Sequence, residues 1–347
     1  MKKTIALTGG GTAGHVTTNL NLIPYLIPNF DKIIYIGSQT GLERDMVKDK
    51  VAYYPITTTK LNRSLSISNL FIPYRLYQGY KEAKKLLIEN NVNVVFSKGG
   101  YVSLPVVLAC NKLHIPLIIH ESDLTLGLAN RIAARFANTV CTTFKETATM
   151  VKNGVYTGAP LNNIAPLSQN VARVKNMYNL PNNRPICLVV GGSLGAKNIN
   201  DLVITNLDYL TKTHFILHIT GKGKSPKIKH ENYASIEFTL YIKEILSLTD
   251  IAITRGGANM IFELLQANIP MLIIPLEKGS RGDQVKNGSY FAEHNYALLL
   301  RERDSKNFVS MFDSLIARAP FMRKVNHHIL PNNSLDKLAE IIIKTAK

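Results

Sequence analysis

Short apolar runs alternate with segments of helical periodicity along the first half of the chain. Residues 4–8 are apolar or β-branched and end in three glycines, and residues 16–27 then carry apolar side chains at helical spacing. Further apolar runs at 32–36, 92–97, 116–120 and 139–143 alternate with helical patterns at 74–89, 104–111 and 128–136. Short buried strands separated by helices are typical of parallel α/β layers.

The same order starts again in the second half. After the Asn- and Pro-rich stretch 160–185, an apolar run at 186–190 ends in two glycines and precedes a helix expected from about residue 198. Strands are expected at 214–220, 251–254 and 271–275, and helices at 242–248, 258–267 and 334–345. The pattern therefore predicts two Rossmann-like domains with parallel sheets, joined near residues 157–185.

The net charge of the chain bears on the class of partner that the protein binds. Lys and Arg number 41 and Asp and Glu 24 in 347 residues, a net charge of +17. Such a surplus attracts an anionic partner such as nucleic acid, acidic lipid or a phosphorylated substrate, and the equal alternative is that it serves solubility alone. No apolar stretch is long enough to span a membrane, and the first apolar run is too short for a signal peptide. Three scattered cysteines without metal-ligand spacing fit a reducing cytosol.

The glycine turn after the first expected strand is the first candidate site. Residues 9–14 match Gly-x-Gly-x-x-Gly between a strand and a helix, where backbone N–H groups approach phosphate. The second strand ends in Gly37 and Ser38 without the acidic residue that holds an NAD ribose. A phosphate or diphosphate site is favoured over NAD binding and over a purely structural turn, and His15 at its end is a candidate catalytic or substrate-contacting residue.

Residues 191–195 form the matching turn of the second half. They also fit Gly-x-Ser-x-Gly, the nucleophile turn of α/β-hydrolases, with Ser193 as nucleophile and His294 or His327 as base. The first turn has the same glycine chemistry without a serine at the matching place. Twin phosphate loops account for both turns, whereas a hydrolase accounts for one.

A third anion-binding helix start is expected at residues 254–258. Glu263 lies about two turns further on and is a candidate acceptor of hydrogen bonds from a ribose diol, with a solvated surface carboxylate as the alternative. No Asp-x-Asp pair occurs in the sequence. Because N–H-rich loops can neutralise a diphosphate leaving group, we expect no obligatory metal and no cofactor.

These motifs, in this order, resemble glycosyltransferase family 28, and in particular its members that transfer N-acetylglucosamine from UDP-GlcNAc to lipid I to form lipid II in peptidoglycan synthesis. The resemblance runs from residue 4 to about residue 300 and is carried by residues 10–15, 99–103, 120–123, 127–130, 191–196, 255–258, 263 and 283–284. It implies a GT-B fold, two Rossmann domains facing across a cleft. Residues 1–157 with the last helix, 331–347, would bind lipid I and the membrane, and residues 158–330 would bind UDP-GlcNAc.

The resemblance also implies roles for single residues. His15 is the first candidate for the base that deprotonates the muramyl 4-hydroxyl in an inverting displacement, and Glu121 is the second. The acceptor diphosphate would meet Gly11, Thr12, Gly14, Gly99, Gly100 and Tyr101. The donor would meet Asp123, Gly192, Ser193, Gly195, Thr239, Arg255, Ala258, Glu263, Asp283 and Gln284.

Two departures from the family pattern leave contacts open. Asn162 stands where the family often has Arg, so another cation, for instance Arg255, would have to supply one contact to the diphosphate. Asp123 stands where Asn is common. The remaining alternatives are a related GT-B enzyme that glycosylates a membrane lipid such as diacylglycerol, and a non-catalytic nucleotide-sugar-binding module.

A membrane surface is the other expected partner, and no nucleic acid is expected. Residues 60–85 interleave apolar and aromatic side chains with Lys and Arg, a mixture that suits peripheral binding to anionic lipid. The alternative is that the apolar set belongs to the core, as is expected for Leu76, Tyr80, Ala83 and Leu87, which share one helical face. We therefore expect the protein at the cytoplasmic face of the cell membrane.

Overall fold

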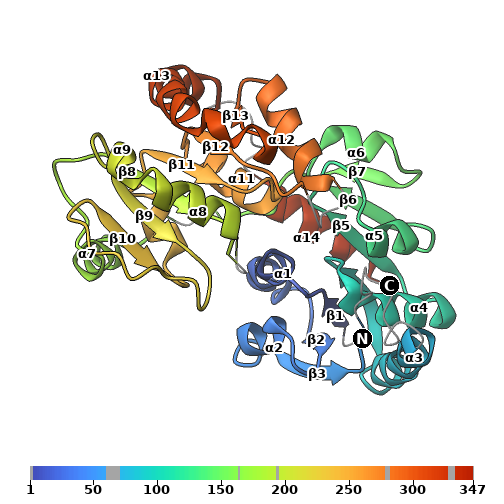
Figure 1. The fold of residues 1–347 in the computed structure, drawn as a ribbon. Helices are drawn as coiled ribbons and strands as arrows, with labels where there is room; N and C mark the ends of the chain where they lie inside the picture. Colours follow the sequence, from blue (N-terminus) through green and yellow to red (C-terminus); the bar gives the residue numbers. More distant parts are fainter. Residues whose placement is uncertain are drawn as a thin grey trace. The chain divides into compact units, whose positions relative to one another are not determined.

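The structure is a computed structural model that describes residues 3–59, 71–162, 165–192, 195–277, 282–326 and 333–346. The chain forms two compact units, Met1–Asn162 with Pro331–Lys347 and Asn163–Leu330 (Figure 1). We call them the first and second unit and describe each by itself.

The first unit is built on a seven-stranded parallel sheet in the order β3-β2-β1-β4-β5-β6-β7. The strands are β1 (Thr4–Thr8), β2 (Lys32–Ser38), β3 (Ala52–Ile56), β4 (Val92–Ser97), β5 (Leu117–Glu121), β6 (Thr139–Thr142) and β7 (Gly154–Tyr156). All five residues of β1 are buried, as expected of a central strand covered on both faces.

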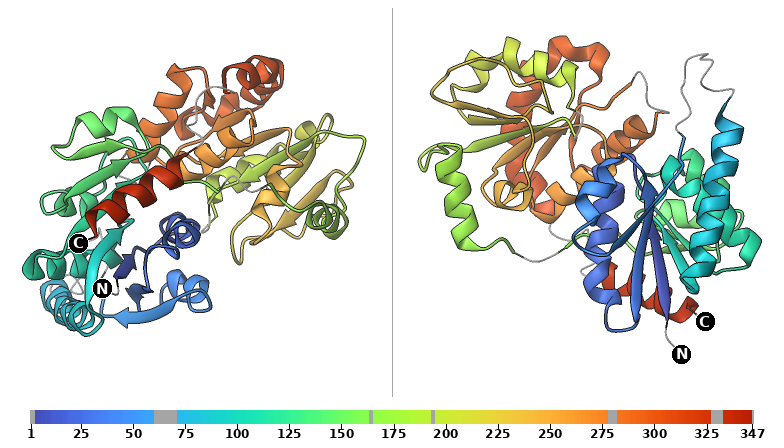
Figure 2. Two further views of the ribbon diagram at one scale, coloured as in Figure 1. Left: turned by 180° about the vertical axis from the view of Figure 1, so that it is seen from behind. Right: turned by 90° about the horizontal axis from the view of Figure 1, so that it is seen from below.

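Helices cover both faces of this sheet: α1 (Ala13–Leu26), α2 (Leu42–Val47), α3 (Ile72–Glu89), α4 (Leu104–Leu113), α5 (Leu128–Ala133), α6 (Lys145–Thr149) and α14 (Ser334–Thr345), with a 3₁₀ turn at Tyr101–Ser103. Side chains of α1 and α14 share one hydrophobic core with the sheet, and those of α3, α4 and α5 share another. Figure 2 shows α14, in red, lying along the first unit. The last helix thus completes the domain formed by the start of the chain.

The second unit repeats the plan with six parallel strands in the order β10-β9-β8-β11-β12-β13. The strands are β8 (Ile186–Val190), β9 (Phe215–Ile219), β10 (Tyr233–Ile236), β11 (Ile251–Thr254), β12 (Met271–Ile273) and β13 (Leu298–Leu299). The helices are α7 (Ser168–Met177), α8 (Lys197–Thr205), α9 (Leu207–Leu210), α10 (Ile242–Leu246), α11 (Ala258–Gln266), α12 (Asp283–Glu293) and α13 (Phe308–Asn326), with a 3₁₀ segment at Glu302–Asn307. Residues of α8, α9 and α13 share a core with β8, β9, β11 and β12.

The predicted fold class, two parallel-sheet α/β domains, is confirmed. The pattern missed elements with few buried apolar residues, among them β3, α7 and α12. The stretch 157–185, expected to join the domains, holds the helix α7, and the boundary between the two units falls between residues 162 and 163. Among the described residues, no helix is long and apolar enough to cross a membrane.

Candidate functional site

The first glycine turn leads directly from β1 into α1. Thr12 is extended at φ −144° and ψ 152°, and its side chain makes no capping hydrogen bond to this helix, which lies wholly within the described residues. The first N–H groups of α1 thus keep the donors and the positive partial charge that bind anions. Gly11 lies in this turn, and Gly14 is the second residue of α1. Both belong to the segment in which the sequence predicts a phosphate site.

The second predicted acceptor loop, residues 99–101, packs against the first. The Gly10 N–H donates to the Gly99 carbonyl oxygen at 3.4 Å. Gly100 has φ +82°, and a Cβ there would lie 2.3 Å from the Gly10 oxygen and 3.0 Å from His15 Nδ1. Only glycine fits so close an approach. The fold therefore brings Gly99 and Gly100 to the turn that carries His15.

His15 is held in one orientation by the turn it closes. Its Nδ1 lies 2.8 Å from the Gly10 carbonyl oxygen. Because a carbonyl only accepts hydrogen bonds, Nδ1 carries the proton of the neutral ring and Nε2 keeps its lone pair. Burial, with the nearby Lys98 cation, lowers the pKa of His15, while Gly10, Asp123 and Glu43 oppose the shift. The ring is therefore a neutral base at physiological pH.

Lys98 is the residue that the sequence analysis missed. It lies between the end of β4 and Gly99, is 1% exposed, and its Nζ donates to the Ser122 hydroxyl. Burial lowers its pKa to about 8, against the attraction of Glu121 and Asp123, so it carries its charge at neutral pH. In the sequence it looks like one more surface lysine in a basic chain. Only the packing of the loops reveals a buried cation near His15.

Glu121, the second candidate base, organises its own loop. One carboxylate oxygen accepts the Asp123 N–H at 3.0 Å, and the other accepts the Gly127 N–H at 3.0 Å and the Asn130 side-chain amide at 2.9 Å. Asn130 also lies against Gly99, since a Cβ on that glycine would be 2.6 Å from its Oδ1. Both carboxylate oxygens of Glu121 are thus engaged by hydrogen bonds within its own loop, one of them with the N–H of Asp123.

In the second unit the glycine turn after β8 has the same tight construction. Gly195 has φ +68°, and a Cβ there would lie 2.1 Å from the Thr220 carbonyl oxygen. Asn200, in α8, donates to that oxygen at 3.0 Å and contacts the buried His218 ring at 3.0 Å. Gly192 is exposed, and Ser193 lies outside the described residues. Contacts of Gly195 and Asn200 with the Thr220 carbonyl therefore hold this turn in place, whereas Gly192 is exposed.

Arg255 follows β11 and is engaged in a buried ion pair. Its Nη1 lies 2.7 Å from Glu302 Oε1 and 3.1 Å from the Ile274 carbonyl oxygen. The arginine and glutamate side chains are 9% and 13% exposed. Glu302 also accepts from the Asn198 amide at 2.8 Å. Arg255 thus ties together loops around the predicted donor site through its Nη1 atom.

Two further donor-site candidates lie around α11. Gly257 caps this helix without a side chain, and Ala258, its first residue, is buried. Glu263 is partly exposed, and burial raises its pKa to about 7, opposed by Lys243. Thr239 Oγ1 accepts the Tyr241 N–H at 3.0 Å, which fixes the loop before α10.

The start of α12 packs against the loop that contains Arg255. A Cβ on Gly256 would lie 2.2 Å from the Gln284 carbonyl oxygen, and Asn287 donates to the Gly256 carbonyl at 2.9 Å. Gln284 Oε1 accepts the Leu276 N–H at 3.0 Å, and Asp283 is the first residue of α12. The contact between Gly256 and Gln284 thus brings the first residues of α12, Asp283 and Gln284, next to the loop that leads into Ala258 at the start of α11. Within the described residues, no cluster of three or more His, Cys, Asp or Glu could hold a metal ion.

Several known proteins are similar to this chain in sequence and in fold. Residues 5–142 match the glycosyltransferase family 28 N-terminal domain, and residues 186–320 match the family 28 C-terminal domain. The UDP-N-acetylglucosamine--N-acetylmuramyl-(pentapeptide) pyrophosphoryl-undecaprenol N-acetylglucosamine transferase of Lachnospira eligens is 41% identical, covering 100% of both chains. The protein of the same name from Clostridium tetani is 39% identical over 99% of this chain and 98% of its own.

A solved structure has a similar fold. Acinetobacter baumannii MurG superposes with a TM-score of 0.76 over 99% of this chain and 100% of its own, at 22% sequence identity. With both domain families matched in order and relatives of about 40% identity along the whole chain, this protein belongs to glycosyltransferase family 28.

Proposed function

We propose that this protein transfers N-acetylglucosamine from UDP-GlcNAc to the 4-hydroxyl of the muramyl sugar of lipid I, forming lipid II with inversion at the anomeric carbon. The observation that carries the proposal is the full-length similarity, at 41% and 39% identity, to two transferases whose names state this donor sugar and this acceptor. The two glycine turns, one in each unit, support it chemically, since donor and acceptor each bring a diphosphate.

The first unit is assigned the acceptor. The diphosphate of lipid I meets the turn at Gly11, Thr12 and Gly14 and the adjoining loop at Gly99 to Tyr101. His15 Nε2 removes the proton from the attacking hydroxyl, because the Gly10 carbonyl already holds the Nδ1 proton. Burial and the Lys98 cation lower the pKa of that imidazole and so keep it neutral, and Glu121 positions Asp123 for contact with the donor sugar.

The second unit is assigned UDP-GlcNAc. N–H groups at residues 192–195 and at the start of α11 stabilise the charge that develops on the UDP leaving group. Glu263 accepts the ribose hydroxyls, Thr239 lies beside the base, and Ala258, Asp283 and Gln284 contact the sugar and diphosphate. Arg255 acts by holding these loops, through Glu302, rather than by direct contact with phosphate.

The lipid tail of the acceptor stays in the bilayer, so the enzyme works as a peripheral protein at the cytoplasmic face of the membrane. The exposed face of α3 supports this, with Phe71, Tyr74 and Tyr77 at 55%, 68% and 54% exposure and Lys81 over the Tyr77 ring at 4.7 Å. Residues 60–70 of the predicted patch lie outside the described residues. The inner face of the helix belongs to the core, where Ala83 and Leu87 are buried.

An assay of acceptor choice tests the proposal. The protein is incubated with UDP-GlcNAc and either synthetic lipid I, diacylglycerol or no acceptor, and UDP release is measured. We expect release that depends on lipid I. Release with diacylglycerol alone would favour the related lipid glycosyltransferase, and binding of UDP-GlcNAc without release under any condition would favour a non-catalytic binding module.

A further inference from the structure

A chain of buried polar side chains lies behind the glycine turn of the second unit and ends at the turn itself. Asn200 donates from its side-chain amide to the Thr220 carbonyl oxygen at 3.0 Å, and this oxygen leaves no room for a Cβ on Gly195. The Asn200 Oδ1 atom lies 3.0 Å from His218 Nε2, and His218 Nδ1 lies 3.1 Å from the Tyr233 hydroxyl. His218 is fully buried, so these contacts replace hydrogen bonds to water.

The chemistry of these groups fixes which of them donate and which accept. The Thr220 carbonyl only accepts, so the Asn200 amide nitrogen faces it and Oδ1 faces His218. Nε2 of His218 therefore carries the proton, and Nδ1 accepts from the Tyr233 hydroxyl. Burial lowers the pKa of His218 to about 4 and raises that of Tyr233 to about 12, so both groups are neutral at physiological pH. One arrangement thus satisfies the whole chain.

The first unit has a similar arrangement behind its own glycine turn. Asn19, in α1, donates from its side-chain amide to the Thr8 carbonyl oxygen and to the Tyr35 hydroxyl, both at 3.1 Å. The Tyr35 hydroxyl in turn donates to the Gly9 carbonyl oxygen at 2.7 Å. Asn19 and Tyr35 are fully buried. The tyrosine therefore bonds directly to the backbone that begins the turn.

The two arrangements occupy equivalent places in the two units. Asn19 stands eight residues after Gly11, and Asn200 stands eight residues after Gly192. In each unit the aromatic partner comes from the strand beside the one that leads into the turn, from β2 beside β1 and from β9 beside β8. One buried asparagine thus connects the helix after the turn, the neighbouring strand and the backbone of the turn.

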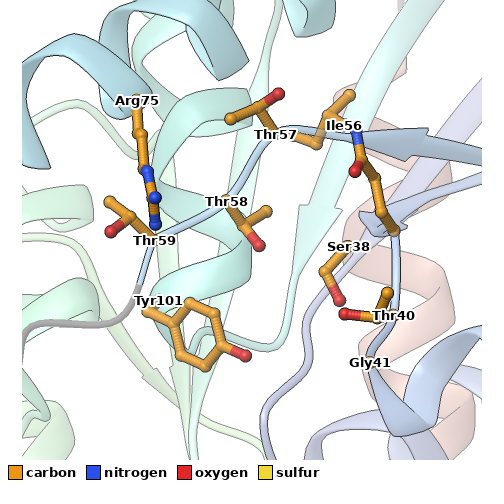
Figure 3. Close-up of a pocket in the computed structure, with 10 residues that line it drawn as sticks. Ser38, Thr40, Gly41, Ile56, Thr57, Thr58, Thr59, Arg75 and Tyr101 are labelled. Carbon is orange, nitrogen blue, oxygen red and sulfur yellow. The ribbon is translucent and has the colours of Figure 1, made fainter. Parts of the chain in front are cut away.

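The turn of the first unit needs such contacts because it has open space nearby. A polar cavity of about 530 Å³ has Ser38, Arg75 and Tyr101 in its lining (Figure 3). The Tyr101 ring also packs against Gly11, since a Cβ on that glycine would lie 2.9 Å from a ring carbon. Atoms beside such a space make fewer packing contacts than atoms in a filled core. The position of the turn therefore depends on its buried hydrogen bonds.

We propose that these buried pairs position the two glycine turns for their substrates, with Asn200 and His218 holding the turn assigned to the donor and Asn19 and Tyr35 holding the turn assigned to the acceptor. The inference rests on the proposed function and adds to it residues that touch neither substrate. A backbone N–H group stabilises a phosphate only when it points at the phosphate oxygen. A small displacement of a turn therefore weakens the binding of its own substrate.

Steady-state kinetics with both substrates varied test the proposal, because the two pairs should act on different constants. His218→Leu should raise the donor KM by roughly fivefold, the factor that corresponds to one neutral hydrogen bond, and leave the acceptor KM within about twofold. His218→Gln keeps an N–H donor and an oxygen acceptor and should recover part of the loss. Tyr35→Phe removes only a hydroxyl and should raise the acceptor KM, with the donor KM within about twofold.

Two control variants separate positioning from a general loss of packing. His214→Leu removes another buried histidine of the same unit, which stands before the amino end of β9 and so at the far end of that strand from the turn. Tyr53→Phe removes a hydroxyl that donates to the Ser38 carbonyl rather than to the turn. Both variants should keep both KM values within about twofold. If His218→Leu and Tyr35→Phe likewise lower thermal stability without changing a KM, their role is structural and the inference is wrong.

Calorimetric titration with UDP gives a readout that does not need turnover. His218→Leu should bind UDP roughly fivefold more weakly than the wild type at a temperature well below unfolding, whereas Tyr35→Phe should bind it as the wild type does. Equal UDP affinity of His218→Leu and the wild type would overturn the inference and leave the proposed function intact. A wild type that binds UDP but does not use lipid I would contradict the proposed function, and weaker UDP binding by His218→Leu would still support the role of His218.

Discussion

The Nδ1 atom of His15 lies 2.8 Å from the carbonyl oxygen of Gly10, and this contact decides which ring nitrogen can act as a base. The proton sits on Nδ1, so Nε2 is the free lone pair. The contact ties the base to the glycine turn itself. The turn that we propose binds phosphate therefore also orients the residue that we propose as the base.

Replacing His15 by Ala should lower kcat by ~10²-fold or more and leave the donor KM nearly unchanged, since general-base catalysis contributes about that factor. Steady-state kinetics with both substrates varied measures the two constants. A collapse of donor binding with a kcat near that of the wild type would assign His15 to the donor, and the base would then be another residue.

The pH dependence of kcat should reveal the effect of Lys98 on the pKa of His15. Burial and the Lys98 cation lower the pKa of His15, while Asp123 and Glu43 oppose them, so the acid limb of kcat should fall below pH 6.5. Lys98→Met removes the cation, raises the pKa of His15 and should move that limb to higher pH. Lys112→Met, an exposed lysine on α4, is the matched control. If the acid limb does not move in Lys98→Met, then Lys98 does not set the pKa of the base.

Glu263 should couple donor binding to proton release. Burial raises its pKa to about 7, against the opposing charge of Lys243, so part of the protein carries a protonated carboxyl at neutral pH. Ribose hydroxyls stabilise the ionised form, so binding of UDP-GlcNAc at pH 7 should release protons. Calorimetry in buffers of different ionisation enthalpy measures the number released. Glu263→Gln should abolish the release and raise the donor KM by ~10-fold or more. Equal release by both proteins would place the ribose elsewhere.

The Arg255–Glu302 pair should contribute to the stability of the second unit. Burial alone would raise the pKa of Glu302, but hydrogen bonds from Arg255 and Asn198 outweigh it and lower the pKa. Its contribution to stability is therefore present above the unfolded-state pKa and is lost as pH falls through the lower folded value. Glu302→Ala leaves Arg255 buried without its partner and should cost about 3–5 kcal/mol, measurable by urea unfolding at pH 7. An unchanged unfolding free energy would contradict the pairing.

Membrane association should depend on the exposed face of α3. Replacing Lys81, Lys84 and Lys85 by Glu should weaken co-sedimentation with anionic vesicles, because each cation near such a surface contributes about 1 kcal/mol. High salt should weaken the wild type in the same way, and UDP-GlcNAc affinity should stay constant. Equal vesicle binding by the variant and the wild type would place the contact elsewhere.

The sequence predicted the elements with continuous buried runs and missed those shaped by tertiary contacts. The expected bounds of β1, β4, β8 and β11 agree with the structure, because these strands are almost wholly buried and their composition shows it. The half-exposed strand β3 and the polar helix α12 carry no such signal. Periodicity reflects burial, so an element with little burial is hard to recognise.

The same limit applies to the site. Glycine turns and His15 were visible because their spacing is local. The burial of Lys98 depends on Ser122, 24 residues away, and the pairing of Arg255 depends on Glu302, 47 residues away. No local pattern distinguishes a lysine or arginine with such a partner from a surface cation. The sequence therefore indicated which loops form the candidate site, but not which of its cations are buried or paired.

Analysis of the lipid product tests the central claim most directly. The wild type is incubated with UDP-GlcNAc and synthetic lipid I, and the extracted lipid is examined by mass spectrometry and by NMR of the new anomeric proton. We predict a product that is heavier by one N-acetylglucosamine residue and joined in β linkage to the muramyl 4-oxygen. An α linkage would contradict inverting displacement, and unmodified lipid I in a reaction that consumes UDP-GlcNAc would contradict the assigned acceptor.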